Sequence, residues 1–299
     1  MRIGFWPGPN NTWGDTVALA RHAEETGWDS VWFADHFMPN ADDNSGPTSE
    51  CWTTLAALAV TVPRVRLGSL VVGNTYRHPA VLAKMAANVD ILSGGRLVLG
   101  LGAGWQENEH AAYGIEFSTV PGRLRRLEEA CQVVNGLLRQ ERTDVEGKYY
   151  QLTAAPLAPK PVQARVPLLI GGGGEQKTLR IAARYADEWN VWGTPEFLRQ
   201  KMAVLDQRCE EIGRDPKEIE RSANAMLTIS DEPERVERAK AAGPRVIAGN
   251  AEQVGEQLRD YAESGVHELI IPDFNLGRDR AAKLEMMDRF REIASAALG

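Results

Sequence analysis

The sequence predicts an α/β protein built as a single (β/α)8 TIM barrel with an insertion between its fourth and fifth strands. Eight short apolar segments of strand type recur along the 299 residues, and segments with helical spacing separate them. Ala-Glu steps followed by Gly27 and Gly265 lead into two of the strands, and glycine there can end a helix in the left-handed conformation. Eight such units plus an insertion match the size of a TIM barrel, which has roughly 250 residues.

The strands follow from runs of apolar and β-branched residues, and the helices from apolar residues three or four positions apart. One helix carries Leu55, Leu58, Ala59 and Val62, and another carries Leu198, Met202 and Leu205. The expected strands lie near Arg2 to Pro7, Asp29 to Ala34, Arg66 to Val72, Arg96 to Leu101, Pro167 to Gly171, Glu188 to Trp192, Arg221 to Ile229 and Glu268 to Ile271.

The longest break in the alternation lies between the fourth and fifth strands, over about residues 105–165. A helix is expected there from about Gly122 to Leu138, followed by a stretch spaced by prolines and a short hairpin around residues 145–150. No linker rich in serine and glycine divides the chain, so residues 1–299 are expected to form one domain.

Composition and charge exclude several classes of protein. Lysine and arginine number 34 against 41 aspartates and glutamates, a net charge of −7, so the usual basic footprint of a nucleic-acid binder is absent. No apolar run is long enough for a membrane span or a secretory signal, so we expect a cytoplasmic protein. Cys51, Cys131 and Cys209 lack metal-binding spacing, so we expect reduced cysteines in helix packing and no metal site.

The chemistry of a TIM barrel lies at the carboxyl ends of its strands, where Asp35 and His36 follow the second strand. An imidazole there can transfer a proton near neutral pH, and a neighbouring carboxylate can fix its tautomer. A surface histidine that caps a loop is the alternative.

Glycines follow the fourth strand in the segment Gly100-Leu101-Gly102-Ala103-Gly104-Trp105. The third glycine of a dinucleotide-binding fingerprint is missing, so these glycines instead suggest close approach of a flat ligand to the backbone. Glu109 and His110 come next and are expected to line the mouth of the barrel, although a solvated helix start is the alternative.

The fifth strand runs into Gly171, Gly172, Gly173 and Gly174 before a helix expected near Gln176. Free backbone N–H groups and the positive end of a helix favour a phosphate there, with Lys177, Thr178 and Arg180 in support. A flexible turn is the alternative, and the GxxxxGK[ST] sequence of a Walker loop is absent.

Tryptophans lie at or just past strand ends, where a pocket for a planar ring system would need large aromatic side chains. Each of them could instead serve packing alone. The four expected in a substrate pocket are Trp6, Trp13, Trp105 and Trp192.

As a set, these residues resemble the bacterial-luciferase-like flavin and deazaflavin oxidoreductases. The resemblance covers almost the whole chain, and the step Gly102-Ala103-Gly104-Trp105 with Glu109-His110 resembles the branch that depends on coenzyme F420. The segments that carry it are Ser30 to Phe37, Gly73 to Ala80, Leu92 to Leu97, Gly100 to Trp105 and Ile170 to Gly174.

The resemblance implies a TIM barrel that holds the cofactor ring over the strand mouths, with Asp35 at its edge and His36 as acid or base. It also implies a non-prolyl cis peptide within Leu70 to Val72 that presses a bulge against the ring. The remaining residues that it implies in cofactor binding are Leu70, Val71, Asn74, Ala103, Gly104, Gly171, Gly172, Gly173, Gly174, Gln176, Lys177 and Thr178.

Sugar-phosphate dehydrogenases of this family carry an acidic residue where this chain has Trp105 and an aromatic residue where it has Asn40. The resemblance therefore leaves the small-molecule substrate open.

Three hypotheses follow. The first is an F420-dependent oxidoreductase that transfers a hydride, in which His36 moves a proton. The second is a reduced-FMN monooxygenase that uses O2 and receives its flavin from a separate reductase. The third is a barrel that binds a ligand without turnover, for which Trp105 in place of an acid is the best argument. We expect a homodimer in each case.

Overall fold

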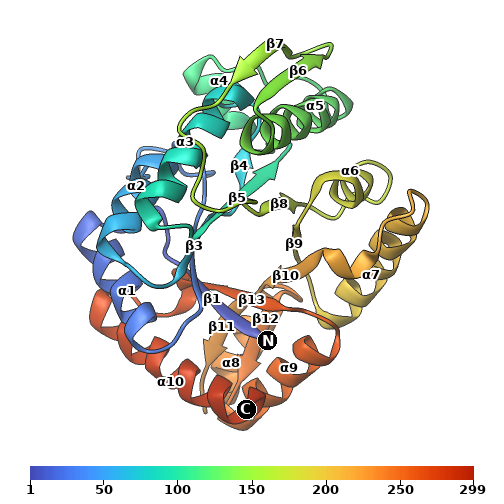
Figure 1. Ribbon diagram of the computed structural model, residues 1–299. Helices are drawn as coiled ribbons and strands as arrows, with labels where there is room; N and C mark the ends of the chain where they lie inside the picture. Colours follow the sequence, from blue (N-terminus) through green and yellow to red (C-terminus); the bar gives the residue numbers. More distant parts are fainter.

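A parallel barrel forms the centre of the computed structural model, which describes residues 1–299 (Figure 1). Its strands neighbour one another in the order β3-β2-β1-β13-β10-β9-β8-β5, and pairing of β3 with β5 closes the ring. The predicted fold class is thus confirmed. The barrel strands are β1 (Arg2–Trp6), β2 (Ser30–Phe33), β3 (Arg66–Ser69), β5 (Leu97–Gly102), β8 (Leu168–Gly171), β9 (Glu188–Trp192), β10 (Glu220–Asn224) and β13 (Glu268–Pro272).

Helices surround the barrel, and polar residues at their starts explain where several begin. The Thr12, Thr119 and Thr194 side chains each accept a hydrogen bond from the backbone amide three residues later, and Asn250 forms a capping box with Gln253. The outer helices are α1 (Trp13–Glu25), α2 (Cys51–Thr61), α3 (Pro79–Ser93), α5 (Val120–Arg139), α6 (Thr178–Tyr185), α7 (Pro195–Glu210), α9 (Ala251–Glu263) and α10 (Arg280–Leu298).

The expected helix ends and cysteine environments are confirmed. Gly27 and Gly265, with φ of +82° and +94°, follow the C-caps of α1 and α9. At both positions the backbone can therefore turn into the next strand. Cys51, Cys131 and Cys209 are free, buried and located on α2, α5 and α7.

The expected seventh strand, Arg221 to Ile229, is wrong as a single strand. The chain changes partners at Ala225, whose amide donates to Ile270, whereas the amide of Met226 donates to Arg245. Beyond that point β11 (Met226–Ile229) leaves the barrel and pairs with β12 (Val246–Gly249), which the sequence analysis missed. Helix α8 (Pro233–Ala241) connects these two strands.

The third expected strand is interrupted after Ser69. A cis peptide joins Leu70 to Val71, as the resemblance implies, and β4 (Val72–Gly73) then resumes pairing with β5. We call residues 70 and 71 the bulge.

Between β5 and β8 the chain forms α4 (Glu107–Tyr113), α5 and an antiparallel hairpin of β6 (Arg142–Glu146) and β7 (Gln151–Pro156). The expected hairpin and helix are confirmed, and α5 packs between α3 and α6 as part of the outer ring (Figure 1). The single domain over residues 1–299 and the limits of the insertion at about 105–165 stay predictions.

Side chains fill the barrel interior and leave no pore. Trp32 on β2 is fully buried and lies across Gly68 on β3, where any Cβ would collide with the indole ring. Seven buried residues from five strands, the residue after β2 and the bulge form this inner cluster, namely Trp6, Trp32, Ala34, Leu70, Val98, Leu169 and Ile270. The larger apolar core lies between the barrel and its helices.

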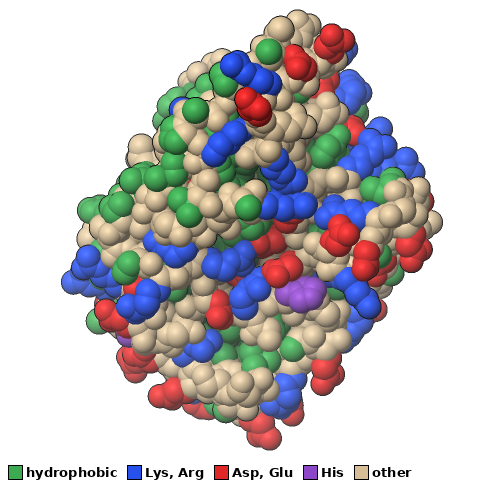
Figure 2. All heavy atoms as spheres, viewed as in Figure 1, with side chains coloured by type: hydrophobic (Ala, Val, Ile, Leu, Met, Phe, Trp, Pro, Cys, Tyr) green, Lys and Arg blue, Asp and Glu red, His purple; other side chains and the backbone are tan.

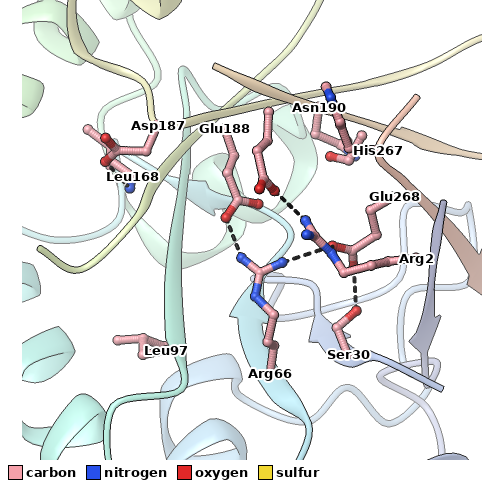
Figure 3. Close-up of polar contacts among 12 residues, drawn as sticks. Arg2, Ser30, Arg66, Leu97, Leu168, Asp187, Glu188, Asn190, His267 and Glu268 are labelled. Carbon is pink, nitrogen blue, oxygen red and sulfur yellow. Dashed lines mark hydrogen bonds and ion pairs between the residues drawn. The ribbon is translucent and has the colours of Figure 1, made fainter. Parts of the chain in front are cut away.

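A network of charged side chains closes the amino-terminal end of the barrel. Figure 3 shows Arg66 pointing between Glu188 and Glu268, and its Nη1 lies 2.9 Å from Glu268 Oε2. Arg2 bonds to Glu268 and Glu220, so two arginines face three glutamates. Glu188 and Glu268 are buried, and removing a carboxylate from water costs free energy. A guanidinium group beside each of them offsets this cost.

On the face in Figure 2, basic and acidic side chains are intermixed, in keeping with the net charge of −7. None of the helices combines the length and the apolar character needed to cross a membrane.

The amino-terminal network makes stability depend on pH through Glu188. Burial, reinforced by Glu268 and Glu220 and opposed by Arg66, raises the pKa of Glu188 from 4.5 to about 7. Between these pH values the folded chain holds a proton that the unfolded chain releases, so the contribution of Glu188 is present below pH 4.5 and lost as pH rises through 7.

We therefore expect Glu188→Gln to flatten the pH dependence of the free energy of unfolding by about 3 kcal/mol across this window. Denaturant titrations of both proteins from pH 4.5 to 8 measure it. Glu237→Gln, at an exposed residue, is the control and should parallel the wild type. Parallel curves for Glu188→Gln would contradict the assignment.

Candidate active site

A cavity of about 840 Å³ opens at the carboxyl ends of the barrel strands, where the fold predicts the chemistry. Most of the residues expected from the sequence line it, drawn from six strands and the loops that follow them. They are Trp6, Asp35, His36, Leu70, Val71, Ala103, Gly104, Trp105, Gly171, Gly172, Gly173, Thr178 and Trp192. The expected residues outside this lining are Trp13, Asn74, Glu109, His110, Gly174, Gln176 and Lys177.

His36 is held by a buried carboxylate. Its Nδ1 lies 2.8 Å from Oε1 of Glu109, which also accepts from the Tyr76 hydroxyl, and the amide of Phe37 donates to Glu109 Oε2 at 2.7 Å. Because an ionised carboxylate only accepts, Nδ1 of the neutral ring carries the proton and Nε2 is left for the cavity.

Glu109 is ionised in this arrangement. Burial alone would raise the pKa of its carboxyl, but the hydrogen bonds from His36, Phe37 and Tyr76 lower it below the ordinary value of a glutamate. Burial, together with the same contact to Glu109, raises the pKa of the Tyr76 phenol, which therefore remains a donor. Glu109 and its hydrogen-bond donors therefore fix the tautomer of His36, the side chain that would transfer a proton.

The expectation that Glu109 and His110 form part of the pocket wall is corrected, because both are buried behind it. His110 Nδ1 donates to the carbonyl of Gln106 at 2.6 Å, and its Nε2 accepts from the Thr75 hydroxyl at 2.6 Å. Helix α4 thus presents its polar side inward, toward the ends of β2 and β4. Residues after these two strands form hydrogen bonds with the buried side chains of Glu109 and His110.

Asp35 lines the cavity, but its carboxylate is occupied. Arg77 donates to both of its oxygens, at 2.6 and 3.0 Å, and also to Glu50 at 2.6 Å. Burial raises the pKa of Asp35, and the bonds from Arg77 oppose that rise. A carboxylate engaged in this way cannot serve as a free base, which leaves His36 as the candidate for proton transfer.

Glycines at two strand ends make room for the bulge. A Cβ on Gly171 would lie 2.9 and 3.0 Å from the two Cγ atoms of Val71, and one on Gly102 would lie 2.7 Å from Cγ2. Real Cβ contacts are longer than this, so β5 and β8 need glycine here for Val71 to reach the cavity.

The glycine segment after β8 has unoccupied donors. The amide of Gly172 bonds to Asn190, whereas those of Gly173 and Gly174 donate to no protein acceptor, and Gly172 adopts a φ of +118°. Helix α6 begins at Thr178 and not at Gln176 as expected, which leaves Gln176 and Lys177 in the loop. The donors of a phosphate cradle are therefore present, with Thr178 at its helical side.

The cations of the cavity differ from those expected. Lys177 and Arg180 do not line it, whereas Lys201 on α7, which also pairs with Glu175 at 2.6 Å, and Arg245 before β12 do line it. Nothing in the local sequence of these two residues marks them, because their placement depends on how α7 and β12 pack.

Polar residues on β9 and β10 were also missed. Asn190 and Asn224 line the cavity, and their amide groups bond reciprocally at 3.2 and 3.0 Å. Alternation along β9 could have revealed Asn190, because residues 188, 190 and 192 share the inward face. Trp13, by contrast, begins α1 and is 47% exposed, away from the cavity.

The chain is similar to known proteins over most of its length. The family model described as luciferase-like monooxygenase matches residues 1–245. An F420-dependent glucose-6-phosphate dehydrogenase of Kineococcus radiotolerans is 34% identical over 74% of this chain and 65% of its own length. An F420-dependent hydroxymycolic acid dehydrogenase of Mycobacterium tuberculosis is 30% identical over 88% of this chain and 72% of its own.

Among solved structures, an F420-dependent secondary alcohol dehydrogenase in complex with an F420-acetone adduct superposes with a TM-score of 0.87 at 23% identity, covering 99% of this chain and 98% of that one. The chain thus spans just under two thirds of the Kineococcus relative, and the solved structure has the same fold over nearly its whole length.

Proposed function

Because the chain belongs to the luciferase-like monooxygenase family, we propose that it is an oxidoreductase that uses coenzyme F420 to move a hydride to or from a small organic substrate. The hydrogen bond between His36 and Glu109 carries the proposal, since it sets a proton-transfer nitrogen at the wall of the cavity. The names of the two relatives support the choice of cofactor.

The residues of the cavity fit this cofactor. The free amide of Gly173 and the Thr178 hydroxyl would hold its phosphate, together with the amide of Gly174 just outside the lining, and Val71 would support its ring. Arg245 offers positive charge for its carboxylates, and Lys201 would do so in exchange for its ion pair with Glu175. When bound, coenzyme F420 supplies the acceptor or donor of the hydride.

His36 supplies the accompanying proton transfer. In oxidation of an alcohol, Nε2 accepts the hydroxyl proton as the carbon gives up its hydride, and in reduction of a carbonyl it returns that proton. Glu109 stabilises the imidazolium that forms, because its carboxylate is buried and ionised beside Nδ1. Tyr76 and the Phe37 amide hold Glu109 in place.

A reduced-FMN monooxygenase with a separate flavin reductase is the second candidate, and the description of the matching family model favours it. A barrel that binds without turnover is disfavoured by the position of the His36–Glu109 pair, whose imidazole lines the cavity. The proposal includes a cytoplasmic homodimer. Three reduced cysteines support the compartment, and exposed apolar side chains on α2 and α3, among them Val60, Val81 and Leu92, support self-association.

Titration with each cofactor tests the proposal. We expect F420 to bind the purified protein with quenching of cofactor fluorescence, and FMN to bind at least about tenfold more weakly, because Lys201 and Arg245 match the additional carboxylates of F420. Equilibrium fluorescence at matched ionic strength gives both Kd values. Tight binding of FMN without a response to F420 would overturn the proposal in favour of the monooxygenase.

A further inference from the structure

The cavity has an aromatic side with no role in the proposed function so far. The ring centroids of Trp6 and Trp192 lie 5.9 Å apart, and those of Trp6 and Phe274 lie 5.2 Å apart in an edge-on arrangement. All three residues line the cavity, and Phe274 is 46% exposed. We call Trp6, Trp192 and Phe274 the aromatic wall.

Trp6 of the aromatic wall lies across the barrel from Gly171, whereas Trp192 ends β9, the neighbour of β8. In the strand order, β1 is four positions from β8 in either direction, so Trp6 at the end of β1 faces the side where Gly171 contacts Val71. A ring supported by the bulge would leave Trp6, at the end of β1, and Phe274, after β13, free for a second molecule. The wall therefore belongs to the part of the cavity available to substrate.

Trp105 adds a second aromatic surface next to the proton-transfer group. Its ring lies 5.4 Å from that of His36 in an edge-on arrangement, and it is 62% exposed. An apolar group beside His36 Nε2 would cover this exposed indole face and remove apolar surface of both partners from water.

The charges of the lining exclude other substrate classes. Asp35 is the only carboxylate among the lining residues, and Arg77 holds both of its oxygens. An amine would therefore find no counter-charge. On the side of the wall the lining is aromatic, so the hydroxyl groups of a sugar placed against it would lack hydrogen-bond partners there.

We propose that the substrate is a neutral alcohol, or the matching carbonyl compound, whose oxygen-bearing carbon carries an aromatic or cyclic hydrocarbon group. The oxygen lies toward His36, and the hydrocarbon group lies between Trp105 and the aromatic wall. This inference rests on the proposed function, because it takes the direction of proton transfer from His36.

A substrate series with the F420-loaded protein tests the class. We expect kcat/KM to fall about 10- to 100-fold from 1-phenylethanol to 2-propanol, because the phenyl group loses its burial, and to fall further for glucose 6-phosphate. A higher kcat/KM for glucose 6-phosphate, or equal values for the two alcohols, would overturn the inference.

Direct binding gives a readout without turnover. Calorimetric titration of the F420-loaded protein with acetophenone should give a Kd that rises at least about fivefold in Trp105→Ala and in Phe274→Ala. Trp13→Ala, which removes an exposed tryptophan outside the cavity, is the matched control and should bind acetophenone like the wild type.

Unchanged binding in both cavity variants would reject the aromatic wall as a substrate site. Failure of the proposed function has a different signature, since the protein would then not bind F420 at all, and the earlier cofactor titration detects that independently.

Discussion

Replacement of His36 by Ala is expected to lower kcat about 10²- to 10⁴-fold, the usual contribution of a positioned acid or base. The Kd for F420 should change little, because His36 contacts Glu109 and Trp105 and lies away from the glycine cradle. Steady-state absorbance of the cofactor measures kcat, and added imidazole should restore part of it by filling the space left by the side chain.

His22→Ala is the matched control. His22 also pairs with a carboxylate, Asp288, and its side chain is 21% exposed against 22% for His36, but it lies on α1 outside the cavity. Its kcat should equal that of the wild type. Equal turnover of His36→Ala and His22→Ala at every pH would remove His36 from the mechanism.

Glu109→Gln separates positioning from proton transfer. The amide keeps the size of the side chain but removes the charge that stabilises the imidazolium, so a smaller loss of kcat than in His36→Ala is expected. Nitrogen-15 chemical shifts of the His36 ring should report a mixture of tautomers in place of the Nδ1–H form, because the amide can present either an oxygen or an N–H group to Nδ1.

The sequence was sufficient to locate His36 and the glycines, because both follow directly from where parallel strands end. It was insufficient for Glu109. That residue lies 73 positions from His36, and its side chain reaches Nδ1 only because α4 crosses the end of β2 with its polar side inward. Helical spacing indicates that such a side exists, but not which strand end it meets.

A similar limit explains the strand that divides at Ala225. Residues 221–229 form one continuous run of strand type, and local propensity carries no sign that the first half pairs with β13 and the second with β12. The division matters for the site, because it brings Arg245, directly before β12, to the cavity. Partner exchange between strands is a tertiary property, and Arg245, which it positions, was therefore missed.

Gly171→Ala is expected to lower the free energy of unfolding by about 1–3 kcal/mol and to weaken F420 binding about tenfold or more. The new Cβ would lie 2.9 and 3.0 Å from the Cγ atoms of Val71, so either β8 or the bulge must shift. Because the bulge would support the cofactor ring in the proposed function, a shift of a few tenths of an ångström there costs affinity as well as stability. Chemical denaturation and fluorescence titration measure the two effects separately.

Shortening Val71 tests whether its contact with the new Cβ causes the loss of stability. In Gly171→Ala combined with Val71→Ala, the closest remaining atom of residue 71 is its Cβ, at 3.5 Å, an ordinary contact. The double variant should recover stability relative to Gly171→Ala but not F420 affinity, since the apolar support of the ring is gone. Gly255→Ala on α9, whose Cβ would meet Ala297 at 3.6 Å, should leave both properties near those of the wild type. If Gly171→Ala kept the stability and F420 affinity of Gly255→Ala, position 171 would not require glycine. Val71 could then not be the surface on which the cofactor rests.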